Sequence, residues 1–568
     1  MPEQDEEQLR RKVWRIINLL QANQLFVHSG TLTVKYEDER GKVKRMKLPE
    51  IITIGCLNAL VPNSALLLVG GHGGGKTSLV KLMGRMFTGM RLEEVERGIV
   101  RGHPQLTEEK LIATLRIAKL MKEGVEEVVW RDFVTHFWKI IDEVNRLTAY
   151  AQDMLLSLLA EGRVKYYDAV RPTTPYCLFA TINPKDVGTH ELSLPFLDRF
   201  GMAIPISMPT SHDLSIILGG RDEKFAGYDE LVQVPQVMTQ NELMSVWYHV
   251  DRVECTTEAK NFIHAILREF SLCTRVDKGN SDRLKPGTGL CSGCHFNVKK
   301  LVCNKVQSIL SVRVAKDLQR YSKALAWLLG LSRVDTQVVA TIAPYVINHR
   351  SKFVDRELEK SPYFGNALAF SAHLVDLVRQ RFAQRASCYE IVEKYRAGLG
   401  EKKDLQFLKE FSTSDLITKH DLLPLVKSLS KAAYAKKVVK IREADEQRDL
   451  ETLTAIRDEL LEDLTFPNRG DLIAQINQAL YKHTLSSYAF TFREWKAIWP
   501  EIAGEFPSLN APLRESLQRQ QTRQLRTQDL VIVINVTGTS AGDVVNVDVS
   551  GGVGAVRLKE ILEARGGG

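Results

Sequence analysis

The residues best suited to chemistry lie in a glycine-rich run near the start of the chain. An apolar stretch, Ala65 to Val69, leads into Gly70-Gly71-His72-Gly73-Gly74-Gly75-Lys76-Thr77, and a helical pattern begins at Ser78. In the pattern G-x-x-x-x-G-K-[ST], backbone N–H groups surround phosphates, the Lys reaches the β and γ oxygens, and the hydroxyl binds Mg²⁺. We therefore predict a strand, a phosphate loop running from Gly70 to Ser78, and a helix.

A second apolar run, Phe137 to Ile141, ends in two carboxylates, Asp142 and Glu143. Phosphoryl transfer requires one group that holds the metal and another that activates water. We assign Mg²⁺ binding, together with Thr77, to Asp142, and polarisation of the attacking water to Glu143. Lys139 interrupts the apolar run, and we expect its ammonium to reach solvent from near the strand start.

A third apolar run, Tyr176 to Ile182, ends in Asn183 and Pro184. An amide at the end of a neighbouring strand can orient the attacking water or contact the γ-phosphate, the role known as sensor 1. The alternative is an ordinary Asn-Pro turn.

These elements belong to a chain of 568 residues, long enough for three or four domains of about 150 residues each. With 44% hydrophobic and 26% charged residues, its composition excludes a mostly disordered or fibrous protein. The net charge of +8 is too small to indicate nucleic-acid binding by itself. No apolar run approaches the ~18 residues of a membrane span, and the acidic start lacks signal-peptide character. These features predict a cytoplasmic protein.

Several blocks of sequence together resemble the MoxR-type AAA+ ATPases, which are related to the magnesium-chelatase motor subunit and the dynein-related ATPases. The blocks follow the family's order and spacing: the loop Gly70 to Thr77, the string Asp142 to Arg146, the hairpin-like Glu161 to Tyr166, the segment Phe179 to Pro184 leading to Leu197 to Phe200, and a lid-like region from Ser311 to Arg350.

The resemblance covers roughly residues 45 to 353 and implies an α/β fold, a P-loop AAA+ core with a parallel sheet and a helical lid. The residue pattern beyond it predicts a mostly helical C-terminal region and a small β unit. We divide the chain into five parts: an N-terminal helix and hairpin (1–50), the nucleotide-binding domain (51–212), the lid with a Cys-rich insertion (213–353), a helical domain (354–528), and a small β unit with a tail (529–568).

The resemblance also assigns roles to two arginines. Arg199 is similar to the arginine finger that reaches the nucleotide of a neighbouring subunit, and Arg313 is similar to the sensor 2 arginine of the lid. A guanidinium beside the γ-phosphate stabilises charge in the transition state. The alternatives are a salt bridge from Arg199 to Asp198 or Glu191 and a solvated helix face for Arg313. Arg146 and Arg163 are further candidates for contacts between subunits.

The resemblance implies a Mg²⁺-dependent ATPase that forms a ring, expected to be a hexamer. It also implies remodelling of a protein client, often together with a partner that carries a von Willebrand A domain. An amphipathic helix expected over Thr107 to Lys122 is where the family engages its client. Two alternatives stay open. One is a nucleic-acid motor of the McrB or minichromosome-maintenance kind, using Arg163 and Lys165, and the other is a scaffold whose assembly is regulated by ATP.

Four cysteines lie close together in sequence between the sensor 1 and sensor 2 segments. Cys291 and Cys294 form a C-x-x-C pair, flanked by Cys273 and Cys303. Four thiolates can hold a structural Zn²⁺, which we favour, or an iron–sulfur cluster. The alternatives are reduced cysteines without metal or a redox pair at Cys291 and Cys294. The remaining cysteines lie in apolar settings and are expected to be core thiols: Cys56, Cys177, Cys255 and Cys388.

Beyond residue 353 the pattern is mostly helical and shows no second catalytic motif. Val/Ile-rich runs, Leu530 to Thr537 and Val544 to Ser550, predict a β-hairpin, and Val553 to Leu558 is expected to add a strand. Near the N-terminus, Leu32 to Tyr36 and Val43 to Leu48 predict another hairpin.

Overall fold

The protein is described by a computed structural model in which the chain forms two compact units, residues 1–386 and residues 387–568. The structure describes residues 5–22, 30–37, 42–71, 75–173, 175–184, 190–207, 210–211, 215, 234–272, 301–397, 402–429, 432–462, 469–510, 522–526, 530–536, 544–551 and 553–565.

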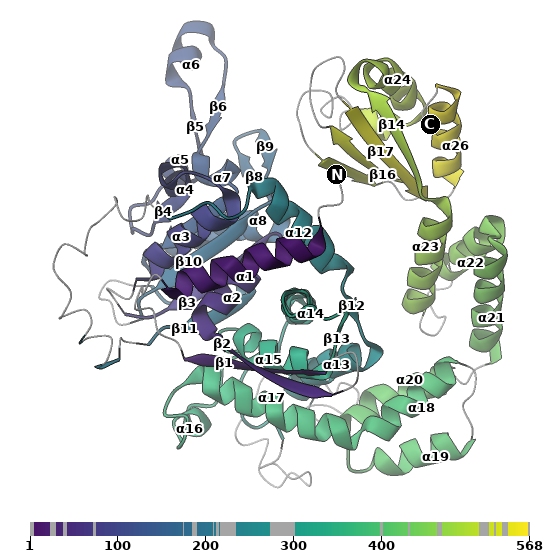
Figure 1. The fold of residues 1–568 in the computed structure, drawn as a ribbon. Helices are drawn as coiled ribbons and strands as arrows, with labels where there is room; N and C mark the ends of the chain where they lie inside the picture. The colour runs from purple at the N-terminus through teal and green to yellow at the C-terminus, as the bar shows by residue number, and fades with distance from the viewer. Residues whose placement is uncertain are drawn as a thin grey trace. The chain divides into compact units, whose positions relative to one another are not determined.

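A parallel five-stranded sheet forms the centre of the first unit (Figure 1). Its strands lie in the order β11 (Met202–Pro205), β3 (Ser64–Val69), β10 (Cys177–Ile182), β7 (Trp138–Asp142) and β4 (Ile99–Arg101). Strands buried on both faces are continuous apolar runs, which is why the three runs recognised in the sequence form β3, β7 and β10. Because the strands are parallel, the polar residues that follow them meet at one edge of the sheet.

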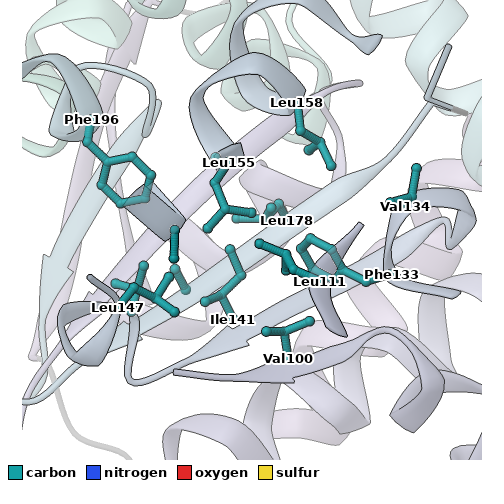
Figure 2. Close-up of a cluster of buried hydrophobic side chains, with 14 of the residues drawn as sticks. Val100, Leu111, Phe133, Val134, Ile141, Leu147, Leu155, Leu158, Leu178 and Phe196 are labelled. Carbon is teal, nitrogen blue, oxygen red and sulfur yellow. The ribbon is translucent and has the colours of Figure 1, made fainter. Parts of the chain in front are cut away.

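One face of this sheet is covered by a cluster of buried apolar side chains (Figure 2). Ile141 and Leu178 come from the strands, Leu155 and Leu158 from α8 (Ala149–Glu161), and Phe196 from α9 (Leu194–Leu197). Burial of apolar surface contributes about 25 cal/mol per Å². The sheet edge that carries the polar residues is therefore held on a closely packed base.

The other elements of the first unit are helices and short strands around this sheet (Figure 1). The helices that precede residue 213 include α1 (Glu6–Ala22), α2 (Glu50–Ala59), α3 (Lys76–Thr88) and α4 (Leu92–Arg97). The described helices of the segment predicted as the lid are α12 (Gln240–Arg252), α13 (Thr257–Ser271), α14 (Val312–Leu328) and α15 (Thr336–Ile347), and α16 (Asp355–Leu358) and α17 (Ala367–Gln384) follow that segment. Two short strands, β12 (Glu254–Cys255) and β13 (Arg333–Val334), pair within the lid.

Three antiparallel hairpins lie outside the central sheet. The predicted N-terminal hairpin is confirmed as β1 (Thr31–Glu37) paired with β2 (Val43–Pro49). The second is β8 (Arg163–Tyr166) paired with β9 (Ala169–Pro172), and the third is β5 (Ala113–Leu115) paired with β6 (Val128–Trp130).

The prediction of one amphipathic helix over Thr107 to Lys122 is wrong. The segment forms α5 (Glu108–Leu111), strand β5 and then α6 (Ile117–Glu123). Leu111, Ile112 and Ala113 are all buried, and three consecutive buried positions do not fit one helix face. Helix α6 instead stands at the tip of the β5–β6 hairpin and projects from the sheet (Figure 1).

The second unit contains helices and a four-stranded antiparallel sheet. Its helices are α18 (Ala386–Arg396), α19 (Lys402–Phe411), α20 (Leu423–Leu429), α21 (Ala432–Gln447), α22 (Leu450–Glu462), α23 (Arg469–Thr484), α24 (Phe492–Glu505) and α26 (Val553–Ala564). The sheet order is β14 (Ser486–Thr491), β17 (Val544–Gly551), β16 (Leu530–Val536) and β15 (Thr522–Arg526).

The predicted pairing of Leu530 to Thr537 with Val544 to Ser550 is confirmed by β16 and β17. The prediction of a strand at Val553 to Leu558 is wrong, since this segment begins α26. Ala555, Leu558 and Leu562 recur at helical spacing and are buried against the sheet, so one helix face satisfies all three.

Along the described part of the chain, no helix combines the length and the apolar character that crossing a bilayer requires.

Candidate functional site

The predicted phosphate loop lies between strand β3 and helix α3. His72, Gly73 and Gly74 lie outside the described residues, and Gly75 precedes the first residue of α3, Lys76. Gly75 has a φ of 66°, a left-handed conformation that glycine adopts without side-chain strain. The turn thus brings Lys76 to the N-terminus of α3, where backbone N–H groups and the helix dipole favour an anion.

The Lys76 ammonium lies over the start of the loop. Its Nζ donates hydrogen bonds to the carbonyl oxygens of Gly70 and Gly71, at 2.9 and 2.5 Å. Burial lowers the pKa of Lys76, while the charges of Asp142 and Glu143 act in the opposite direction. The ammonium is therefore held close to the two carboxylates by the loop.

Asp142 accepts hydrogen bonds from two threonine hydroxyls at the end of β7. Thr77 Oγ1 donates to Asp142 Oδ1 at 2.9 Å, and Thr181 Oγ1 donates to the same oxygen at 2.7 Å. Hard oxygen ligands such as a carboxylate and a hydroxyl suit Mg²⁺, which also binds phosphate oxygens at such sites. The pair Thr77 and Asp142 therefore fits the predicted magnesium site.

Glu143 has a left-handed backbone, with φ 56° and ψ 53°. This conformation costs a residue other than glycine roughly 1–2 kcal/mol. The strain is held by hydrogen bonds: the Glu143 N–H donates to Thr181 Oγ1 at 2.8 Å, and the Gly102 N–H donates to the Asp142 carbonyl at 2.6 Å. Strain of this kind at a strand end is typical of residues whose direction matters for function.

Gly102 is required for the close approach of β4 and β7 at this point. A Cβ atom at Gly102 would lie 2.0 Å from the carbonyl oxygen of Glu143, a distance that no packing tolerates. The absence of a side chain at Gly102 thus lets the chain after β4 support the backbone that carries Glu143.

The side chain of Glu143 faces a nearby cation. Arg146 Nε lies 3.2 Å from Glu143 Oε2, and both side chains are about one third exposed. Such a pair contributes little to stability but fixes the direction of the carboxylate. Arg146, a candidate for contacts between subunits, therefore also lies at the carboxylate assigned to water activation.

Asn183 follows β10 at the same sheet edge and is buried. Its carbonyl oxygen accepts a hydrogen bond from Asn145 Nδ2 at 2.9 Å, and the Asn145 carbonyl accepts one from His190 N–H at 2.7 Å. Since β10 lies between β3 and β7, Asn183 lies between the phosphate loop and the carboxylates, where sensor 1 is expected. This network ties the segment after Glu143 to the segment after β10.

Thr181 is the functional candidate that the sequence analysis missed. Its hydroxyl accepts from Glu143 N–H while it donates to Asp142, so one side chain links both carboxylate residues. A threonine inside an apolar β-strand is common, and only its position directly after the last β10–β7 pair, Ala180 with Ile141, distinguishes it.

The predicted arginines, Arg199 and Arg313, lie at the other edge of the sheet. The Gly201 N–H donates to the Ala65 carbonyl at the beginning of β3, whereas the phosphate loop follows the end of that strand. Five residues of strand separate the two edges by about 15 Å. The structure thus brings Arg199 and Arg313 together but does not bring them to Lys76.

Both arginines face one carboxylate, Asp198. Arg313 Nη1 donates to Asp198 Oδ2 at 3.2 Å, and Arg199 Nη1 lies 4.0 Å from the same oxygen. The salt bridge considered for Arg199 is therefore long. Arg199 Nε is buried without a hydrogen-bond partner. Burial, assisted by the charges of Arg313 and Arg350, lowers the pKa of Arg199.

A cavity opens beside the phosphate loop, at the end of β11. Its volume is about 490 Å³, and its wall includes Pro205 and Ser207. The residue between them, Ile206, approaches Gly70, since a Cβ on Gly70 would lie 2.9 Å from the Ile206 carbonyl. The remaining wall comes from β1, the start of α2, α15 and α17, including Thr33, Glu50, Ala340, Tyr345, Asn366 and Ala369. The sequence analysis named no residue for the nucleotide base.

The expectation that Lys139 reaches solvent is wrong. Lys139 is fully buried, and its Nζ donates to the carbonyl oxygens of Val134 and His136, at 3.0 and 2.7 Å, and to that of Phe133. Burial lowers the pKa of Lys139 to about 7. Three carbonyl acceptors satisfy the ammonium hydrogens, which allows a lysine inside β7.

Of the four cysteines predicted to bind metal, Cys273, Cys291 and Cys294 lie outside the described residues, and Cys303 is half-buried. Within the described ranges, no three His, Cys, Asp or Glu side chains are grouped as metal ligands. The zinc or iron–sulfur site stays a prediction. The predicted core thiols are confirmed as buried free cysteines: Cys56, Cys177, Cys255 and Cys388.

Comparison with known proteins agrees with this geometry. Residues 65–200 match the family model of the AAA domain (dynein-related subfamily). The chain carries a dynein-related AAA domain. Among solved structures, the chain is similar to the crystal structure of a "putative ATPase" from Cytophaga hutchinsonii, with 19% identity, 65% of this chain and 95% of that chain covered, and a TM-score of 0.47. No curated protein matches the chain.

The dynein-related AAA domain contains the phosphate loop, both carboxylates, Thr181, Asn183 and Arg199, whereas Arg313 lies beyond the matched residues. The match and the geometry support ATP as the ligand, Mg²⁺ as its metal, and hydrolysis as the reaction of this domain.

Proposed function

We propose that this protein is a Mg²⁺-dependent ATPase of the MoxR type that works as a ring of identical subunits, expected to be a hexamer. The observation that carries the proposal is the network in which Thr77 and Thr181 share Asp142 while Thr181 also orients Glu143. A site of this kind holds a metal with one carboxylate and places the next carboxylate beside it to act on water.

The residues divide the reaction as follows. Lys76 and the N-terminus of α3 bind the β- and γ-phosphates. Thr77 and Asp142 would hold Mg²⁺, which would offset the negative charge of the phosphate oxygens. Glu143 accepts a proton from the attacking water, and Asn183 positions that water against the γ-phosphate.

The arginines complete the site of a neighbouring subunit. Arg199 and Arg313 lie about 15 Å from the phosphate loop of their own chain, by strand length, so a phosphate that they touch belongs to another copy. Arg350 lies with them, 3.7 Å from Asp198 Oδ1. Three guanidinium groups face two carboxylates, Asp198 and Asp317, which leaves net positive charge for an anion, as a transition state of phosphoryl transfer requires.

The base of the nucleotide occupies the cavity at the end of β11. Polar groups line it, including Thr33, Glu50 and Asn366, and they can donate to or accept from the edge of a purine. The Tyr345 hydroxyl donates to Glu50 Oε1 at 2.5 Å, which fixes the wall between α2 and α15.

For the ring as a whole, we propose remodelling of a protein client, with a von Willebrand A domain protein as partner. This role rests on the MoxR resemblance, and the projecting β5–β6 hairpin supports it, since Ile117, Met121 and Val125 are exposed there. A nucleic-acid motor is the second candidate because Arg163 and Lys165 are exposed on one side of β8. DNA or RNA that stimulates turnover in a salt-dependent way would favour that candidate.

The decisive experiment is Glu143→Gln in the full chain. We expect ATP binding to persist and turnover to fall by about 10²- to 10⁴-fold, the usual contribution of a general base. The matched control is Glu93→Gln, which alters an exposed carboxylate of α4. Turnover at the wild-type rate in Glu143→Gln would show that Glu143 is not the base. Slow wild-type turnover, with ATP changing only oligomer size, would favour a scaffold instead.

A further inference from the structure

Asp198 joins the core of the first unit to its lid. The residue follows α9 in the core, next to Arg199. From the lid, Ser311 Oγ donates to Asp198 Oδ1 at 2.6 Å, and Arg313 Nη1 donates to Oδ2 at 3.2 Å. Ser311 and Arg313 flank the first residue of α14, so one carboxylate sets the position of that helix start.

Arg350 supplies a third guanidinium group that contacts Asp198. Arg350 is only 2% exposed, and its Nη2 donates to the Asp198 carbonyl at 3.0 Å and to Asp317 Oδ2 at 2.5 Å. Asp317 also lies 3.6 Å from Arg320 Nη1. Asp198 is therefore anchored through its backbone by a buried arginine, and its carboxylate is left to contact groups of core and lid.

The resulting cluster contains more guanidinium groups than carboxylates, and some of its N–H groups make no hydrogen bond. Arg199, Arg313 and Arg350 all lie within 4.0 Å of Asp198, and Asp317 is the second nearby carboxylate. Arg199 Nε and Arg350 Nη1 are buried with no hydrogen-bond partner. Buried N–H groups without an acceptor show that the two carboxylates do not saturate the guanidinium groups, so the cluster retains positive charge.

We propose that Asp198 is the positioning residue that holds Arg199 of the core and Arg313 of the lid in one arrangement, ready for the phosphates of a neighbouring subunit's nucleotide. The inference rests on the proposed function, in which these two arginines act between subunits. A movement of the lid then changes the rate of ATP hydrolysis in the neighbouring subunit through Asp198, because Arg313 moves with α14 while Arg199 stays with the core.

The first test is Asp198→Asn in the full-length protein. The variant keeps the shape of the side chain but removes the charge that opposes the arginines. Misplacement of catalytic groups by about 1 Å costs about 10²-fold in rate. We expect kcat to fall 10- to 100-fold in this way, with the Kd for ATP unchanged, because the phosphate loop of the same chain is intact.

The matched control is Asp153→Asn, which removes an exposed carboxylate of α8 outside this cluster and leaves Asp198 in contact with Arg199 and Arg313. We expect this variant to keep kcat within about threefold of the wild type, since the pair of arginines is still held. An equal loss in both variants would overturn the proposal, because the loss of any carboxylate charge would then explain it. Wild-type kcat in Asp198→Asn would overturn it as well.

The second test mixes two inactive variants. Glu143→Gln subunits supply intact arginines, and Asp198→Asn subunits supply an intact phosphate loop, so mixed rings contain working sites. In a random one-to-one mixture of head-to-tail subunits, about a quarter of the sites combine an intact Glu143 with a neighbour whose arginines are intact, so we expect about a quarter of the wild-type turnover. Recovery would support the proposal, and its absence would overturn it.

A parallel mixture of Glu143→Gln with Arg199→Ala subunits distinguishes a failure of the role of Asp198 from a failure of the proposed function. If that mixture recovers activity while the Asp198→Asn mixture does not, the proposed function stands and the positioning role of Asp198 is refuted. If neither mixture recovers, the action of the arginines between subunits is refuted, and the inference falls with it.

Discussion

The substitution Thr181→Val gives the sharpest test of how the site is held together. Valine fills the same space but removes the hydroxyl that donates to Asp142 Oδ1 at 2.7 Å and accepts from Glu143 N–H at 2.8 Å. Thr181 is 1% exposed, so solvent does not readily replace those bonds.

The expected cost follows from these two bonds. A bond to a charged group contributes about 1.5–3 kcal/mol and a bond between neutral groups about 0.5–1.5 kcal/mol, which totals about 2–4.5 kcal/mol. The neutral bond to Glu143 is comparable to the ~1–2 kcal/mol of left-handed strain that it opposes, so its loss leaves that strain largely uncompensated. Glu143 is then free to leave its observed conformation, and its carboxylate loses its direction.

We expect Thr181→Val to lower kcat by about 10²-fold and Tm by a few degrees, with ATP still bound. Steady-state hydrolysis, binding of a fluorescent ATP analogue and calorimetry measure the three quantities. Thr181→Ser keeps the hydroxyl and should retain most activity. Wild-type turnover in a folded Thr181→Val protein would refute the idea that the threonine orients Glu143.

Three further predictions concern other parts of the first unit. Gly102→Ala places a methyl group against the Glu143 carbonyl and should lower kcat at least 10-fold at unchanged ATP affinity, in a hydrolysis and binding assay. Burial lowers the pKa of Lys139 from 10.5 to about 7. Between pH 7 and pH 10.5 the lysine is therefore protonated in the unfolded state but not in the folded state, so the free energy of unfolding rises with pH. Lys139→Met should flatten that rise, as measured by denaturant titrations at several pH values. Ala340→Trp narrows the cavity beside β11 and should raise the Kd for ATP but not for tripolyphosphate, as measured by calorimetric titration, and equal effects on both ligands would exclude the cavity as the base site.

The central sheet could be predicted because each of its main strands is a continuous apolar run followed by polar residues. That pattern arises when a parallel strand is buried on both faces, so the positions of Lys76, Asp142 and Asn183 followed from the sequence. The hydrogen bonds between these residues could not be predicted, because Thr181 reaches the two carboxylate residues only through the pairing of β10 with β7.

Two features could not be predicted because they depend on contacts between distant segments. Lys139 is held by carbonyl groups of the preceding turn, whose geometry has no sequence signature. Asp198 meets Ser311 and Arg313, more than one hundred residues away, and the side chains alone suggested a salt bridge or a solvated helix. The errors at Thr107 to Lys122 and Val553 to Leu558 arose because short apolar segments fit helix and strand equally well.

The placement of the phosphate loop and the arginine cluster at opposite edges of the sheet has a consequence for assembly. If the arginines act between subunits, as proposed, each subunit of a head-to-tail series completes the site of the next, and an open series always ends in one subunit whose nucleotide lacks arginines. A dimer would then contain one complete site, whereas only a closed ring completes every site. Turnover per subunit should therefore rise with protein concentration until the ring closes, and the closure itself acts as the switch that turns the last site on.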